Sequence, residues 1–100
     1  MNDRPTVDTK EVLSLLSDEY ALEMLNVLVE ESLSARTLSE RLDMSRATVY
    51  RRLDRLESAG VIQSSLAVDP QGHHRKQFSV VVDRLQVMFR SDGVCLEVDE

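Results

Sequence analysis

The stretch SARTLSERLDMSRATVYRRLDRLESAG, residues 34–60, limits the possible fold more than any other part of this sequence. It holds two groups of apolar residues at helical spacing, separated by a short break: Leu38, Leu42, Val49, Leu53 and Leu56. Ser34 and Ser45 can each cap the helix that follows, and Gly60 can end the second helix in a left-handed conformation. The turn at 43–45 is short enough to make the two helices cross steeply. The stretch therefore predicts a helix-turn-helix unit.

The second of these helices, expected over residues 45–59, carries arginines on the side away from its apolar stripe. Its outward and flanking residues are Arg46, Ala47, Thr48, Tyr50, Arg51, Arg52 and Arg55. Arginine can bind guanine or a phosphate through two parallel hydrogen bonds, and threonine and tyrosine can hydrogen-bond base edges or phosphates. This face predicts a helix that lies in the DNA major groove. The base contacts are expected near its N-terminal end, from Ser45, Arg46, Thr48, Tyr50 and Arg51.

Other basic residues of the unit are expected to support this contact. Arg52 and Arg55 extend the basic face of the second helix, and Arg36 and Arg41 lie on the outer surface of the first, where a phosphate contact is expected. A plainer interpretation is a solvated helix surface, with Asp54 and Glu57 pairing with the arginines. We favour DNA binding because the clustered arginines occur together with a serine-capped turn after a second amphipathic helix.

A β-hairpin is expected directly after this unit. Residues 61–68 alternate as a strand does, 69–72 read Asp-Pro-Gln-Gly as in a type I turn, and a returning strand is expected over 77–82. A reading helix followed by a hairpin is a winged helix-turn-helix. The hairpin tip is expected to carry His73, His74, Arg75 and Lys76. Arg75 and Lys76 are expected to contact the DNA backbone or minor groove, whereas the histidines are interpreted as exposed loop residues without a ligand.

The N-terminal third is interpreted as a scaffold of two helices, after a disordered N-terminus at residues 1–8. The first helix is expected to begin at Asp8 or Thr9, with its core-facing side formed by Val12, Leu13 and Leu16. The second is expected over residues 19–32, capped by Ser17 or Asp18. Its expected core-facing residues are Leu22, Leu25, Leu28 and Val29, with Tyr20, Met24 and Leu33 filling gaps.

The C-terminal segment, residues 83–100, predicts a second hairpin with strands over 85–89 and 94–98 around a turn at 91–93. One face of it would carry Leu85, Val87, Phe89, Leu96 and Val98, too much apolar surface to leave exposed on a small domain. Two arrangements stay open. The hairpin, together with the first helix, can join two copies of the chain, or it can extend the wing sheet within one copy.

The chain resembles winged-helix transcription regulators of the ArsR type, in the acidic form found in halophilic archaea. The resemblance lies in the segments DEYALEMLNVL and TLSERLDMSRATVYRRLDRLESAGVI and in the hairpin that follows. The resemblance spans residues 9–82. It implies a dimeric, sequence-specific transcription factor with its recognition helix at 45–59 and its wing at 61–82. Metal-sensing members carry paired cysteines before the recognition helix. Residues 24–42 contain none, so metal sensing is not implied here.

The net charge of −6 seems to oppose binding to a polyanion, but the charge is unevenly distributed. Residues 36–76 hold eight basic and five acidic residues, whereas the rest of the chain holds four basic and thirteen acidic ones. Positive charge is therefore concentrated on the proposed reading unit. Ten of the twelve basic residues are arginine, and scarce lysine with abundant surface carboxylates is what we expect of a protein adapted to high salt.

The expected architecture is mainly α, in the α+β class: three to four helices, a wing and a second hairpin, with the DNA-binding domain over 9–82. The single cysteine, Cys95, cannot form an internal disulfide, and the polar start and the lack of a long apolar run indicate a cytoplasmic protein without a membrane anchor. We expect no enzyme activity, metal, cofactor or small-molecule ligand, because no nucleophile, phosphate loop or ligand cluster is recognisable. The expected partners are double-stranded DNA and a second copy. The rival functions are a winged-helix docking module in a transcription complex and, less favoured because aromatic residues are few, single-stranded nucleic acid binding.

Overall fold

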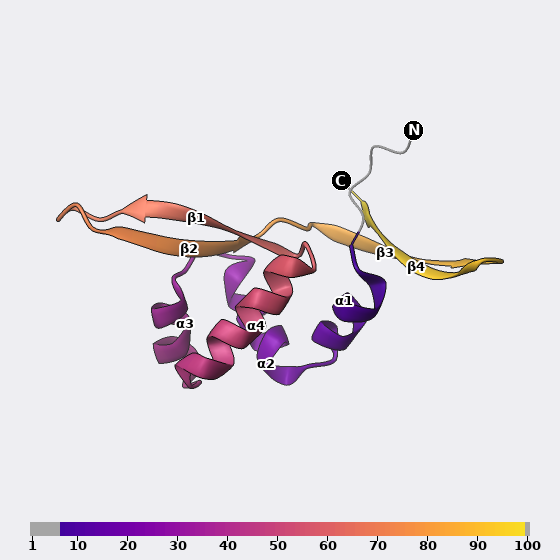
Figure 1. The fold of residues 1–100 in the computed structure, drawn as a ribbon, viewed down its shortest axis with the longest axis horizontal. Coiled ribbons are helices and arrows are strands. Elements are labelled where there is room, and N and C mark those ends of the chain that lie inside the picture. The colour runs from indigo at the N-terminus through magenta and orange to yellow at the C-terminus, as the bar shows by residue number, and fades with distance from the viewer. Residues whose placement is uncertain (1–6, 100) are drawn as a thin grey trace.

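The computed structural model describes residues 7–99 and contains four helices followed by two antiparallel β-hairpins, in the arrangement of a winged helix-turn-helix (Figure 1). The helices are α1 (Thr9–Leu16), α2 (Glu19–Leu28), α3 (Ala35–Leu42) and α4 (Arg46–Ser58). The strands are β1 (Ile62–Val68), β2 (His74–Val80), β3 (Arg84–Arg90) and β4 (Gly93–Asp99). This confirms the predicted fold class. The β1–β2 hairpin and the β3–β4 hairpin extend from opposite ends of the helical body.

The helix-turn-helix unit lies where the sequence predicts it. Ser34 and Ser45 cap α3 and α4, each accepting a hydrogen bond from the backbone N–H three residues on, at 3.2 and 3.1 Å. Asp43, at φ 53°, makes the left-handed turn between the helices. The predicted stripe of α4 is confirmed as core, because Val49, Leu53 and Leu56 are all at most 1% exposed. These three residues anchor α4 and leave its opposite side to solvent.

The expected core faces of α1 and α2 were partly wrong. In α1 the buried residues are Val12 and Leu15, whereas Leu13 and Leu16 are largely exposed. In α2 the buried residues are Ala21, Met24, Leu25 and Leu28, so that Leu22 and Val29 lie outside, as does Tyr20. Asp8 and Asp18 cap these helices. Both helices carry apolar residues, mostly leucine, on more than one side. The sequence pattern therefore does not distinguish the buried side of each helix from the adjacent sides.

The second helix also ends earlier than predicted, at Leu28 rather than at residue 32. The chain leaves the helix so that Leu33 can pair with the wing. Its N–H donates to the Phe78 carbonyl at 3.1 Å and its carbonyl accepts from the Phe78 N–H at 2.8 Å. Phe78 itself is 5% exposed. This bridge fixes the base of the wing to the segment that leads into α3.

The wing is a two-stranded antiparallel sheet in which Ile62 pairs with Val80 and Val68 pairs with His74. The returning strand begins at His74 and ends at Val80, so the predicted bounds of 77–82 were wrong. Residues 74–76 therefore lie in the strand and not in the tip, because they pair with residues 66–68 across the hairpin. The turn predicted at 69–72 is present, with the Gly72 N–H donating to the Asp69 carbonyl at 3.0 Å.

The predicted second hairpin is present, and it forms a sheet of its own rather than an extension of the wing. Leu85, Val87 and Phe89 pair with Val98, Leu96 and Val94, which puts all six on one face. Near the body this face is buried, with Leu96 4% and Val98 6% exposed. At the outer end Phe89 is 80% exposed. The Leu96 N–H donates to the Thr9 hydroxyl at 3.0 Å, which ties β4 to the start of α1.

The described residues also bear on the expected disorder at the N-terminus. Residues 1–6 lie outside the described part of the chain. Val7 packs against the core, and Asp8 caps α1 by accepting the Glu11 N–H at 3.0 Å. Both residues belong to the folded domain.

Candidate nucleic-acid interface

The exposed side of α4 has an N-terminal half that is free of internal ion pairs. Arg46, Tyr50 and Arg51 are exposed, and neither arginine forms an ion pair with any residue between 7 and 99. The hydroxyl of Ser45, besides capping the helix, donates to the Thr48 hydroxyl at 2.9 Å. All five residues expected near the bases thus lie in the N-cap and the first two turns of one helix. Two guanidinium groups there are available to a ligand.

Arg52 has a different environment from its neighbour Arg51. Its guanidinium binds the Asp18 carboxylate at 3.0 Å, with the two side chains only 17% and 19% exposed. It also lies over the Tyr20 ring, 5.5 Å from the centroid. The Ala21 N–H, together with Arg52, holds the pKa of Asp18 below its ordinary value. Arg52 therefore joins α4 to the beginning of α2.

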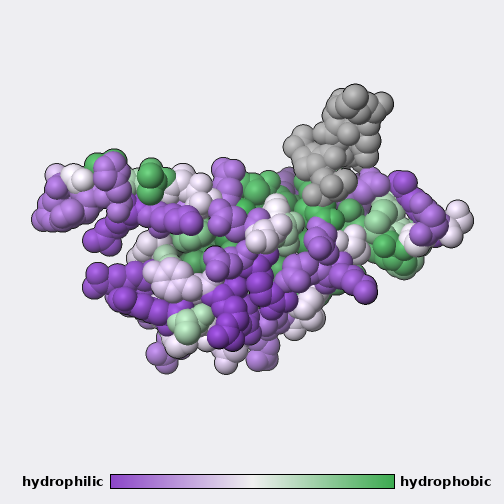
Figure 2. Space-filling model, viewed as in Figure 1, coloured by the Kyte–Doolittle hydropathy of each residue, from purple (hydrophilic) through white to green (hydrophobic). Residues whose placement is uncertain are grey.

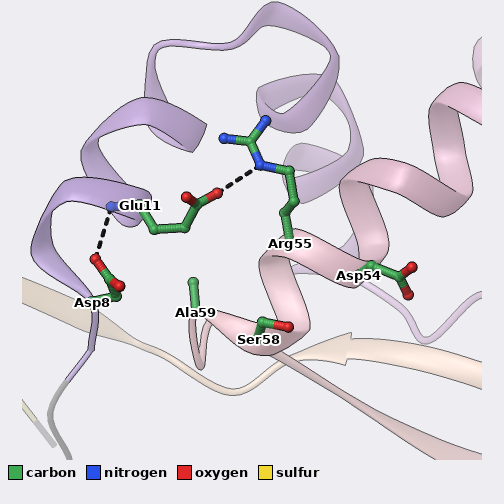
Figure 3. A pocket seen from close by; sticks show the side chains of 6 residues that line it. All are labelled: Asp8, Glu11, Asp54, Arg55, Ser58 and Ala59. Atoms are coloured by element: carbon green, nitrogen blue, oxygen red, sulfur yellow. Dashed lines mark hydrogen bonds and ion pairs between the residues drawn. The ribbon is translucent and has the colours of Figure 1, made fainter.

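Arg55 is also held within the molecule. Its Nε donates to the Glu11 carboxylate at 2.6 Å, and a terminal nitrogen of its guanidinium donates to the Ser14 hydroxyl at 3.3 Å. Figure 3 shows this pair across a surface hollow between α1 and α4. The hollow has a volume of about 360 Å³ and is also lined by Asp8, Asp54, Ser58 and Ala59. The expectation that Arg55 projects freely from the basic face has to be revised.

Sequence reasoning missed Asp18 and Glu11 because each lies more than 30 residues from its arginine. One signal was present in the sequence. On a helical wheel Arg52 is adjacent to Leu56, at the border of the buried stripe. A carboxylate at the start of a preceding helix can meet such a border residue. Identifying which carboxylate required the packing of α1 and α2 against α4.

The wing and the helices enclose a second groove, of about 310 Å³, which brings together four predicted DNA-contacting residues. They are Arg36, Tyr50, Arg75 and Lys76. Arg36 pairs with Glu40 at 3.0 Å on an exposed surface, which is a weak interaction. Lys76 lies over the Phe78 ring at 5.4 Å. The rim of the groove, between α3, α4 and β2, thus carries three basic side chains and one carboxylate, that of Asp54. Arg41, in contrast, pairs with Glu31 at 2.7 Å and does not line it.

The turn of the wing is organised by one carboxylate. Asp69 accepts the backbone N–H groups of His73 at 2.8 Å and Gln71 at 2.9 Å, and its second oxygen lies 3.3 Å from the His73 ring and 3.8 Å from Arg75. The His73 N–H, with these other donors, lowers the pKa of Asp69. His73 is therefore engaged with the turn itself, whereas His74 lies in β2 opposite Val68.

The surface in Figure 2 follows this division. Hydrophilic residues cover the face below the wing, over α3 and α4, and apolar side chains reach the surface on the outer part of the wing and near the second hairpin. No helix within residues 7–99 is long and apolar enough to cross a membrane.

Comparison with known proteins identifies the family and the fold. The crystal structure of NolR from Sinorhizobium fredii aligns with a TM-score of 0.59 and 22% sequence identity, covering 74% of this chain and 69% of that one. The two proteins share the winged helix-turn-helix fold. No curated protein matches this sequence. The family described as HVO_A0261 N-terminal domain matches residues 9–74, which include all four helices and β1. The chain belongs to the HVO_A0261 N-terminal domain family.

Proposed function

We propose that this protein is a sequence-specific, double-stranded DNA-binding transcription regulator of the ArsR-like type. The N-terminal half of α4 enters the major groove, and the wing contacts the backbone or the minor groove. The observation that carries this proposal is the pair Arg46 and Arg51, exposed at one end of α4 with no carboxylate partner among residues 7–99. Two unpaired guanidinium groups near one end of a helix concentrate positive charge where a polyanion can bind.

The ion pairs described above support different proposed roles for individual residues. Arg46, Tyr50 and Arg51 are the proposed base readers, with Ser45 and Thr48 at the helix start. Arg36, Arg75 and Lys76 are proposed to contact phosphates from the rim of the second groove. Arg52 and Arg55 are proposed to hold α4 in position, and a DNA contact by either would require it to leave its carboxylate. We further propose a cytoplasmic homodimer, so that two copies read a symmetric site.

High salt makes this assignment testable. At about 1 M salt the Debye length is only about 3 Å, so long-range attraction to DNA is largely screened. Short bidentate contacts are then the main polar source of affinity, and arginine suits them better than lysine. The binding site is first found by selecting bound duplexes from a random pool at high salt. Two-fold symmetry in the selected sequence is the result expected for a dimer.

Single substitutions then separate reading from general attraction. Arg51→Ala is expected to reduce the preference for the selected duplex over a scrambled one by about 5- to 150-fold, since a bidentate base contact contributes roughly 1–3 kcal/mol of discrimination. Arg36→Ala is expected to weaken binding to both duplexes equally. Lys10→Ala removes the same charge from an exposed position of α1, outside the proposed DNA-binding surface, and is expected to change binding to neither duplex. Equal losses on both duplexes for Arg51→Ala would contradict its role as a base reader.

A further inference from the structure

The outer half of the wing exposes two aliphatic side chains. Leu66 is 71% and Val68 is 63% exposed, and they alternate along β1, so they share one face of the hairpin. Nearer the body, the same face carries Ile62 and Phe78, which are 2% and 5% exposed. The inner part of this face therefore belongs to the core, and its outer part has no cover among residues 7–99.

Polar side chains, one of them a cation, lie beside this aliphatic pair. Across the hairpin, Leu66 is opposite Lys76 and Val68 is opposite His74, so these two share the face, whereas Arg75 is opposite Ala67 on the other face. Lys76 lines the same groove as Tyr50 of α4, which puts this part of the wing beside the proposed reading helix. Figure 2 shows apolar side chains on the outer wing among hydrophilic ones. The surface combines apolar contact area with positive charge.

This combination favours one kind of occupant. The DNA minor groove has walls of deoxyribose C–H groups bordered by phosphates, so it offers apolar surface and negative charge together. A second copy of the wing, packed on this face, would bring Lys76 toward the same cation of its partner, which is unfavourable. The charge of the wing therefore complements a nucleic acid and opposes self-pairing at this face.

We propose that Leu66 and Val68 lie against the minor-groove wall of the bound duplex and supply a part of the DNA affinity that does not decline with salt. The proposal rests on the proposed function. Contacts to phosphates weaken steeply with salt, because each counterion that binding releases gains less entropy in an already concentrated solution. Burial of apolar surface is not screened in this way. An acidic protein adapted to high salt gains from placing part of its DNA contact on aliphatic side chains.

The test measures the affinity for the selected duplex over a range of salt concentrations. In the double variant Leu66→Thr/Val68→Thr, threonine keeps the β-branched shape suited to a strand. We expect binding about 5- to 30-fold weaker at every salt concentration, from the loss of partial burial of two side chains. The slope of log affinity against log salt is expected to stay unchanged. Lys76→Ala, in contrast, is expected to reduce that slope by about one, as for a lost phosphate contact.

Matched controls isolate the wing. Val29→Thr/Val81→Thr makes a similar change at aliphatic residues that are 62% and 47% exposed and lie away from the outer half of the wing, and it is expected to leave binding unchanged. Leu66→Met/Val68→Ile keeps the surface apolar and is expected to bind like the wild type. Equal melting temperatures of all variants establish that each is folded.

Three results would overturn this inference alone. If the double threonine variant binds as tightly as the wild type, Leu66 and Val68 make no apolar contact with the duplex. If this variant shows a reduced salt slope, the contact is ionic rather than apolar. A change in association state without DNA would assign this face to a second copy. A wild-type protein that binds no duplex would refute the proposed function together with this inference, whereas the other outcomes leave the proposed function standing.

Discussion

At the scale of single residues, adjacent arginines on α4 have different environments because of what lies across from them. Arg51 faces solvent, whereas Arg52, one residue on, lies between Asp18 and the Tyr20 ring. Asp18 has two interactions at once, since it also caps α2 by accepting the Ala21 N–H at 3.0 Å. The orientation of the reading helix is therefore connected to the start of α2 through a single carboxylate.

This carboxylate gives a pH prediction. Asparagine can cap a helix but cannot form an ion pair, so Asp18→Asn is expected to lower the free energy of unfolding at pH 7 by about 2 kcal/mol, the contribution typical of a hydrogen bond to a charged group. The folded-state pKa of Asp18 is lowered. Its contribution is thus complete above the ordinary aspartate pKa of about 3.9 and is lost as the pH falls through the lower folded value.

Urea unfolding from pH 7 to pH 2 checks this expectation. The wild type and Asp18→Asn should converge in stability at the acid end, because protonated Asp18 can no longer pair with Arg52. Arg46→Gln, at an exposed position, serves as the control and should stay within about 0.5 kcal/mol of the wild type. A constant difference at every pH would argue against the ion pair as the cause.

At the scale of elements, the joint between α4 and the wing is the feature that aims the wing. Gly60, at φ +85°, ends the helix. The Val61 N–H donates to the Leu56 carbonyl at 3.0 Å and the Gly60 N–H to the Glu57 carbonyl at 3.1 Å, the pattern of a Schellman cap. The buried Val61 and Ile62 follow directly. The direction of β1 is thus set within two residues of the reading helix.

Gly60→Ala is expected to cost about 1–2 kcal/mol of stability, because an L-residue is strained in the left-handed conformation. Steric crowding adds little, since the nearest atom to an added Cβ is a Val7 methyl at 3.6 Å. Thermal unfolding measures the loss, with Ser58→Ala, at an exposed position of α4, as a control expected to stay near the wild type. A stability equal to that of the wild type would mean that the joint relaxes without cost.

At the scale of the whole molecule, the two hairpins separate two kinds of surface. The wing end is basic, whereas the β3–β4 end exposes Val87, Phe89 and Val94 on the continuation of a buried face. An isolated two-stranded sheet is only marginally stable in water, and a second copy would cover this outer part. The proposed dimer therefore uses the end of the molecule opposite the wing (Figure 1).

Phe89→Ser is expected to shift the protein from dimer to monomer by at least tenfold in dissociation constant, because a buried aromatic side chain contributes several times the thermal energy to association. Sedimentation at several concentrations in high salt measures the shift. Tyr50→Ser, the removal of another exposed aromatic at the other end, should leave association unchanged. A wild-type protein that is monomeric throughout would exclude the dimer.

The parts of the fold that could be predicted from the sequence are those governed by local chemistry. The caps at Ser34 and Ser45, the stripe of Val49, Leu53 and Leu56, and the turn at Asp69 each depend on residues a few positions apart. The start of β2 at His74 was missed, because polar residues in a strand exposed on both faces do not alternate with apolar ones. The ion pairs of Arg52 and Arg55 were missed for a different reason: their carboxylate partners are remote in sequence.

The hydrogen bond from the Leu96 N–H to the Thr9 hydroxyl joins positions 87 residues apart. During synthesis the ribosome releases α1 long before it has made β4. The bond between Thr9 and Leu96 can therefore form only after nearly all of the described chain has emerged. The reading helix and the wing need no residue beyond Val80 for their own pairing. The order of translation thus lets the proposed DNA-reading part form first, and the contact between α1 and β4 closes the domain last.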